Sequence, residues 1–99
     1  MTTYRRESGI AEVQGPDRVT LLLVREPGSL PVALTGSGIA VWEELGSGPR
    51  ELEQVVSAVA ERFQVTESLV ESDVRGLCRQ LVQAGFLVPD DVDEGRSSR

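Results

Sequence analysis

The sequence predicts a single α+β domain in which a three-stranded antiparallel β-meander precedes a three-helix bundle. Two observations lead to this fold class. Residues 10–34 consist of short β-rich runs that are separated by turn sequences. Beyond residue 37 the apolar residues recur at helical spacing instead. Because a three-stranded meander cannot bury both of its faces alone, we expect the sheet to lie against the helices.

Three runs predict the strands, at residues 10–13, 18–24 and 30–34. The first alternates weakly, and the second is rich in β-branched and aliphatic side chains. Turn chemistry separates them, with Gly-Pro-Asp at residues 15–17 and Pro-Gly inside residues 25–29. Pro31 has no N–H to donate, and this places the third strand at an edge or a bulge of the sheet.

The first helix is short. Ile39, Trp42 and Leu45 fall three apart on one face, and Thr35 and Ser37 compete for its N-cap position. A Gly/Pro-rich break ends it, and the proline of that break suits the first turn of the next helix. We expect the only tryptophan of the chain to be a core residue that clamps a strand onto the bundle.

The second and third helices are predicted at residues 50–64 and 67–84. The second has the clearest apolar stripe, made of Leu52, Val55, Val56, Val59 and Phe63. Thr66 suits the N-cap of the third, which carries the stripe Val70, Val74, Leu77, Leu81 and Ala84. Gly85 suits a left-handed C-cap. Gly76 costs about 1 kcal/mol relative to alanine inside a helix, and either sequence drift or the close approach of another backbone explains it.

The domain is predicted to span residues 10–88, with residues 86–88 folding back onto the core. Residues 1–9 are polar and are expected to form a flexible N-terminus. Residues 89–99 are expected to be a disordered acidic tail, because they are polar and charged.

Composition excludes several classes of function. The net charge of −6 argues against a nucleic-acid partner, since neutralisation of phosphates dominates such affinity. No apolar run is long enough for a membrane span, and the N-terminus lacks the apolar core of a secretory signal, so a cytoplasmic protein without a membrane partner is expected.

Catalysis and cofactors are not expected either. Cys78 is the only cysteine, and there is no histidine. A disulfide within the chain is therefore impossible, a metal site lacks its usual ligands, and Ser-His or Cys-His nucleophile pairs are excluded. The carboxylates are scattered over predicted helix faces rather than paired, so we predict neither an enzyme nor a metal or cofactor site.

Residues 34–42, "LTGSGIAVW", resemble the "LNxTGxxIW" stretch of the PqqD-like family, the RiPP recognition elements. Residues 51–88 resemble the second half of that family. The matching positions there are Phe63, Val65, Asp73, Val74, Leu77, Leu81, Gly85, Phe86 and Leu87. The resemblance spans roughly residues 10–88, and the joint order and spacing carry it rather than any one motif. It implies a winged-helix-like, PqqD-like fold with the sheet placed before the helices.

The chain also departs from the family pattern. Thr35 replaces the usual Asn, Gly36 and Ser37 stand where polar residues are typical, and the third strand lacks a "GRY/F" entry. These departures lie near the groove that the resemblance implies, so they concern the identity of the bound peptide.

The resemblance implies a binding protein that grips the leader segment of a ribosomally made precursor peptide. The leader adds as a strand beside the third β-strand, and the protein presents it to a separate leader peptidase or modifying enzyme, here of the lasso-peptide type. Carried onto this chain, the strand is Leu30, Pro31, Val32, Ala33 and Leu34. The wall of the cleft is Asp73, Val74, Leu77, Cys78 and Leu81.

Several of these residues have a simpler interpretation as well. Val74, Leu77 and Leu81 suit the core, and Cys78 suits a small buried apolar position. Arg75 and Arg79 have two interpretations. They could bind a carboxylate of the leader, or they could form ion pairs with acidic residues of the same helix. The carboxylate of Asp73 suits either a hydrogen bond from a donor group of the leader or a solvated position on the surface.

Two other classes of function compete. Helices two and three superficially fit a helix-turn-helix, which predicts a winged-helix DNA-binding regulator. Against this, Arg75 and Arg79 share the recognition helix with three acidic residues, Glu67, Glu71 and Asp73. The other alternative is a protein–protein adaptor or dimerisation module without a peptide ligand.

Overall fold

A computed structural model describes residues 2–26 and 28–91 of the 99-residue chain. In chain order the elements are β1 (Thr2–Arg6), β2 (Ile10–Gln14), β3 (Val19–Leu23), β4 (Val32–Leu34), α1 (Ser37–Glu44), the 3₁₀ turn η1 (Leu45–Ser47), β5 (Arg50–Glu51), α2 (Leu52–Phe63), α3 (Glu67–Gln83) and β6 (Leu87–Asp91). The predictions for Pro27 and for residues 92–99 lie outside the described residues. The α+β class, with antiparallel strands and three α-helices, is confirmed for the described part.

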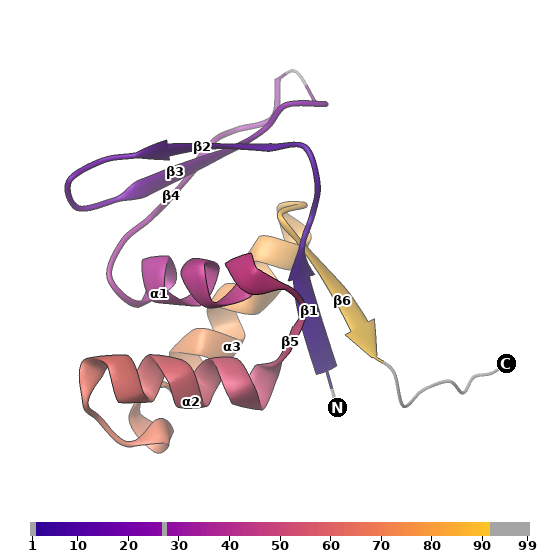
Figure 1. Cartoon of the computed structure of the whole chain (residues 1–99). Coiled ribbons are helices and arrows are strands. Elements are labelled where there is room, and N and C mark those ends of the chain that lie inside the picture. Colours follow the sequence, from indigo (N-terminus) through magenta and orange to yellow (C-terminus); the bar gives the residue numbers. More distant parts are fainter. Residues whose placement is uncertain (1, 27, 92–99) are drawn as a thin grey trace, which may run out of the picture.

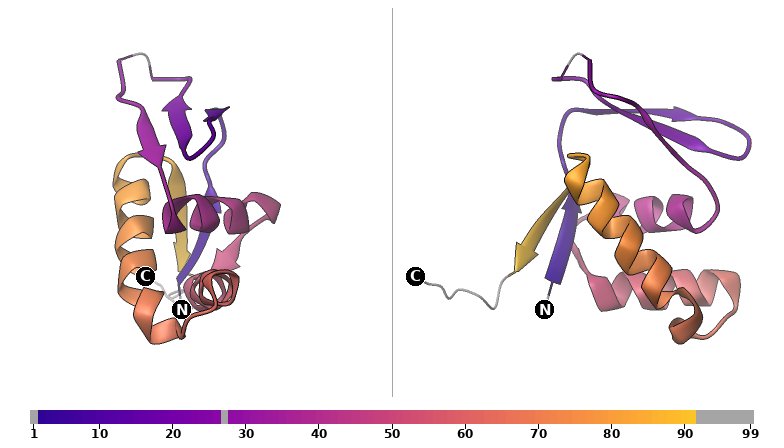
Figure 2. Two further views of the ribbon diagram at one scale, coloured as in Figure 1. Left: turned by 90° about the vertical axis from the view of Figure 1, so that its left-hand side faces the viewer. Right: turned by 180° about the vertical axis from the view of Figure 1, so that it is seen from behind.

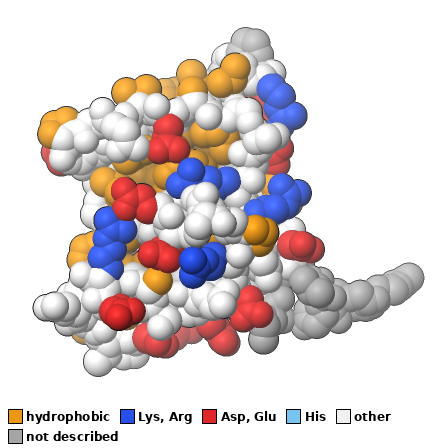
Figure 3. Space-filling model, in the orientation of Figure 1, with side chains coloured by type: hydrophobic (Ala, Val, Ile, Leu, Met, Phe, Trp, Pro, Cys, Tyr) orange, Lys and Arg blue, Asp and Glu red, His pale blue; other side chains and the backbone are white. Residues whose placement is uncertain are grey.

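The predicted meander is present, with antiparallel strand order β2-β3-β4 above the helices (Figure 1). Burial alternates along β3, as expected for a strand with one face on the core. Val19, Leu21 and Leu23 are buried, whereas Leu22 is 40% exposed. The third strand is shorter than predicted. It begins at Val32, and Leu30 is 82% exposed before it. Apolar side chains gather over this upper part of the molecule, as Figure 3 shows.

A second sheet, of order β5-β1-β6, was not predicted, and it corrects the expectation of a flexible N-terminus at residues 2–6 and of a disordered tail at residues 89–91. Thr2–Arg6 form a strand instead of a flexible segment, and that strand pairs antiparallel with Leu87–Asp91. Tyr4 and Leu87 are buried, 7% and 3% exposed, and Phe86 is 1% exposed just before β6. Paired backbone and a few buried apolar side chains therefore hold two segments whose composition is largely polar.

The start of the second helix also differs from the prediction. Arg50–Glu51 pair with β1, so α2 begins at Leu52. Glu51 is its N-cap, and with Gln54 it forms a reciprocal capping box. A capping box satisfies backbone donors of the first turn, a role that a proline at the start of the helix does not fill.

The core lies between the two sheets and the three helices, which Figure 2 shows from two further directions. Trp42 of α1 is 1% exposed, as predicted, and the stripe of α2 is buried from Leu52 to Val59. The stripes end earlier than expected, because Phe63 is 45% exposed and Ala84 is exposed. Phe63 is the last residue of α2, and Ala84 follows the last residue of α3; among the described elements, none covers these two side chains.

The entry to α1 is tighter than the sequence suggests. Its N-cap is Gly36 rather than Thr35 or Ser37, and the backbone there is left-handed, with φ of 55°. The N–H of Gly38 donates to the C=O of Thr35 at 2.9 Å. A glycine reaches this conformation without strain, so β4 can turn directly into α1. At α3, Thr66 is the N-cap and Gly85 has φ of 91°, both as predicted.

Candidate functional site

The strand β4 lies at the edge of its sheet. It pairs with β3 alone, and within residues 2–26 and 28–91 no other strand takes its second side. An edge strand offers backbone N–H and C=O groups to a further strand. Only those residues of β4 whose N–H and C=O point away from β3 can pair with such a strand.

The hydrogen bonds at the two ends of the β2–β3 ladder show which residues of β3 direct their backbone groups toward β2. The N–H of Gly15 donates to the C=O of Arg18 at 2.8 Å, and the N–H of Val24 donates to the C=O of Gly9 at 3.0 Å. In an antiparallel ladder the backbone groups of alternate residues turn to opposite sides. The even-numbered residues of β3 therefore face β2, and its odd-numbered residues face β4.

The register of the β3–β4 pair then orients β4. Val19 is opposite Leu34, and Leu21 is opposite Val32. Both pairs are of the hydrogen-bonded kind, so the backbone groups of Leu34 and Val32 point toward β3. Ala33 lies between them, and its N–H and C=O point to the open edge. Ala33 is thus the centre of the edge.

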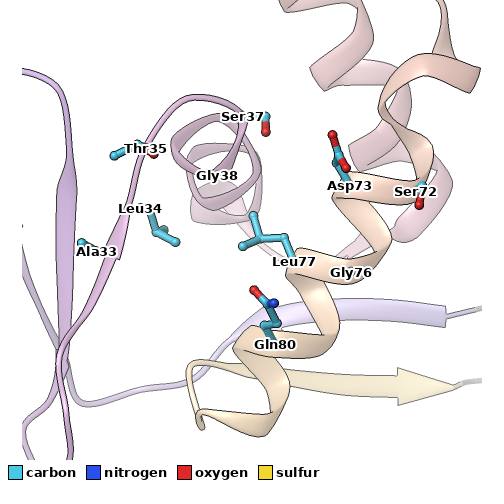
Figure 4. Close-up of a pocket in the computed structure, with 10 residues that line it drawn as sticks. All are labelled: Ala33, Leu34, Thr35, Ser37, Gly38, Ser72, Asp73, Gly76, Leu77 and Gln80. Carbon is cyan, nitrogen blue, oxygen red and sulfur yellow. The ribbon is translucent and has the colours of Figure 1, made fainter.

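A hollow of about 380 Å³ lies beside this edge, between β4, the first turn of α1 and one face of α3 (Figure 4). Its lining residues are Ala33, Leu34, Thr35, Ser37, Gly38, Ser72, Asp73, Gly76, Leu77 and Gln80. Leu34 and Leu77 point toward one another from opposite walls, as Figure 4 shows. The hollow therefore has an apolar centre and a polar rim.

The structure brings together four of the ten residues that the resemblance implies, namely Ala33, Leu34, Asp73 and Leu77. Val32 is half-buried in the same strand, on the same face of the sheet as Leu34. Leu30 and Pro31 precede β4 and do not line the hollow.

The expectation for the cleft wall is corrected at three positions. Val74, Cys78 and Leu81 are at most 1% exposed and belong to the core behind the wall. The reason is helical geometry, because residues three and four apart share a face whereas adjacent residues point about 100° apart. The face toward the hollow carries Asp73, Gly76, Leu77 and Gln80.

Sequence reasoning missed Gly76 and Gln80 as lining residues, together with Ser72 and the entry to α1. A signal was present for the first two. They lie three and seven positions after Asp73, at the spacing of one helix face. The contribution of α1 has no such signal, because it depends on the turn at Gly36.

Charges around the hollow are few. Asp73 forms no ion pair with any residue that the structure describes, and it lies at the rim. Arg75 donates to Glu71 at 2.8 Å, the ion pair that was one of its two interpretations. Arg75 and Arg79 line a separate hollow beside β1 and β6, so neither reaches the edge of β4.

Cys78 is expected to be unreactive in the folded protein. It is fully buried, and burial raises the pKa of its thiol to about 11. At pH 8 the thiolate, which is the nucleophile, is then scarce as well as inaccessible. Alkylation by iodoacetamide, followed by mass spectrometry, should be slow until urea unfolds the chain. Rapid alkylation without urea would show that the α3 core opens readily.

In the described part of the chain, His, Cys, Asp and Glu side chains do not gather into a group of metal ligands. None of the helices there is both long and apolar enough to cross a bilayer.

Comparison with known proteins gives two findings. Residues 21–87 match the model of the family described as coenzyme PQQ synthesis protein D (PqqD). The fold is similar to a solved structure titled "TbiB1 in Complex with the TbiA(beta) Leader Peptide", with a TM-score of 0.70 and 23% sequence identity over 95% of this chain and 99% of that one. Among curated proteins, none matches the sequence. The matched span includes β4, α1 and the whole of α3.

Proposed function

The chain belongs to the PqqD family, and we propose that it binds the leader segment of a ribosomally synthesised precursor peptide by strand addition along β4. It presents that leader to a separate leader peptidase or modifying enzyme, and it acts by binding rather than by catalysis. The product class that the sequence resemblance implies is a lasso peptide. Because the precursor is made on the ribosome, the proposal places the protein in the cytoplasm.

The observation that carries the proposal is the open backbone edge at Ala33 directly beside a hollow that has Leu34 and Leu77 at its centre. A strand that pairs with Ala33 has its own alternate side chains aimed toward α3. The similarity in fold to a structure titled as a leader-peptide complex supports the same ligand class.

The energetics require both the edge and the hollow. Alternation leaves Ala33 with two outward groups, and the flanking Pro31 C=O and Thr35 N–H bring the edge to about four possible bonds. At about 1 kcal/mol each, these bonds only match the roughly 2–5 kcal/mol that ordering a flexible peptide costs. Apolar side chains, at about 1.5–3 kcal/mol each when well buried, must supply the remaining affinity.

The DNA-binding alternative finds no support on α3. Glu67, Glu71 and Asp73 lie on its exposed surface. Arg75 pairs with Glu71, so Arg79 is the one basic residue of α3 that forms no ion pair within the described part of the chain. A surface of this sign repels phosphates.

A titration tests the proposed function. The proposal predicts a short precursor gene near the gene of this protein. The probe is the synthetic leader of that precursor, and the readout is the backbone amide spectrum of ¹⁵N-labelled protein. We expect the largest shifts and the strongest gain in exchange protection at the amide of Ala33, with further amide shifts at Leu77. A scrambled peptide is the control. Shifts confined to the arginine-lined hollow, no binding at all, or tight binding of duplex DNA at low salt would each contradict the proposal.

A further inference from the structure

Gly76 has no structural explanation within the fold. It lies inside the 17-residue helix α3, and its φ is not among the positive values that favour glycine. A Cβ atom built on it meets no heavy atom within 4 Å. The fold therefore tolerates alanine here, although glycine destabilises the interior of a helix relative to alanine.

The other glycines of the described segments differ in this respect. A Cβ on Gly38 would lie 3.5 Å from Leu34 and Leu77, and one on Gly46 would clash with Arg6 at 2.8 Å. Gly15 has Arg18 at 3.3 Å, and the remaining described glycines have positive φ. The contacts of Gly38 are ordinary van der Waals distances, whereas the others have a steric or conformational reason to be glycine. Among the described glycines without positive φ, only Gly76 would place a Cβ in open space.

The open space at Gly76 belongs to the hollow beside β4. Gly76 lines that hollow next to Leu77, on the wall of α3 that faces Leu34 (Figure 4). A side chain at position 76 would project into the space where the guest strand is proposed to lie. Bare helix backbone at this point allows a guest group to approach α3 more closely than any side chain permits.

We propose that Gly76 is a specificity-determining residue that sets how large a leader side chain fits between β4 and α3. This inference rests on the proposed function and adds a size limit to it. With glycine, the wall accepts a large apolar side chain of the leader against the helix backbone, with Leu34 and Leu77 on either side. With alanine or a larger residue, the same position favours smaller guests.

The experiment combines Gly76→Ala with the same synthetic leader and with leaders in which each large apolar residue is changed singly to alanine. We expect Gly76→Ala to raise Tm, by about 4–8 °C for a domain of this size, because the helix gains propensity. We also expect affinity for the parent leader to fall at least tenfold. One alanine-substituted leader should bind both proteins within about threefold of each other, and that leader identifies the guest position.

Ser57→Ala is the matched control. Ser57 is exposed in α2 and does not line the hollow beside β4. The change to alanine therefore raises helix propensity without altering that hollow. Its affinity for the leader should equal that of the wild type. Gly76→Leu extends the series and should weaken parent binding further than alanine does.

The outcomes separate the two proposals. If the wild type binds the leader and Gly76→Ala binds it equally well, the size limit is wrong and the leader-binding function stands. An equal loss with every alanine-substituted leader would also overturn the size limit, because no single guest side chain would then sense position 76. If the wild type does not bind the leader, the proposed function itself fails, and the inference fails with it.

Discussion

Replacing Trp42 by alanine is expected to remove most of the stability of the domain. Trp42 is 1% exposed in the middle of the core, and truncation of a buried Phe or Trp to alanine costs about 3–5 kcal/mol. A small domain has roughly 5–15 kcal/mol of unfolding free energy in total. Urea unfolding followed by circular dichroism should therefore show a much lower midpoint or no folded baseline.

The N-terminal strand adds to this effect. The guanidinium of Arg6 in β1 lies over the indole at 4.1 Å from its centroid, and its Nε donates to the C=O of Trp42 at 3.2 Å. Burial lowers the pKa of Arg6, while Glu12 and Glu43 oppose that shift. The indole thus ties β1 to α1 as well as filling the core, at about 0.5–2 kcal/mol for the cation–π contact.

Trp42→Phe is the matched control for the alanine variant. It keeps most of the ring volume, and it removes an indole N–H that is buried without a hydrogen-bond partner among the described residues. We expect it to lose less than about 1.5 kcal/mol. If Trp42→Ala melts like the wild type, the side chain does not hold the core and its burial has another purpose.

The parts of the fold that were predictable are those with a periodic signal. The alternation of β3 and the stripe of α2 are visible in the sequence because one face of each is buried. The second sheet has no such signal. Its strand β1 buries only Tyr4, and its pairing with residues 87–91 joins opposite ends of the chain. Such pairing depends on tertiary contacts rather than on local pattern.

The sequence identified which strand and helix form the site, but not which of their residues face it. The resemblance identified β4 and α3, yet it assigned Val74, Cys78 and Leu81 to the cleft when they lie in the core. Sequence periodicity shows which α3 residues are apolar, but two adjacent stripes of a helix are distinguished only by what packs on each. The outward direction of Ala33 likewise needs the ladder register, which no sequence pattern gives.

The orientation of β4 decides which variant tests strand addition. A carboxylate at Leu34 would be a poor choice, because Leu34 is only 4% exposed and an unpaired charge there would destabilise the fold itself. Ala33 is exposed, and its N–H points away from β3. A change at this residue therefore acts on the guest and not on the ladder.

Ala33→Pro is accordingly expected to leave the domain folded and to weaken leader binding at least tenfold, which is about 1.4 kcal/mol. Proline is tolerated on an edge strand when the missing N–H faces solvent, so the melting temperature should change little. The guest loses one donor worth about 1 kcal/mol, and the ring occupies the space where the guest backbone would approach. Calorimetric titration with the leader measures the loss.

Two variants of the same strand make the result specific. Ala33→Val keeps the N–H, suits a strand and should bind the leader like the wild type. Val32→Pro removes an N–H that points toward β3, so it should destabilise the meander instead. If Ala33→Pro binds with unchanged affinity while Val32→Pro unfolds, the leader does not pair with β4. The hollow between β4 and α3 would then have to hold its guest without a backbone ladder, against the roughly 2–5 kcal/mol that ordering the guest costs.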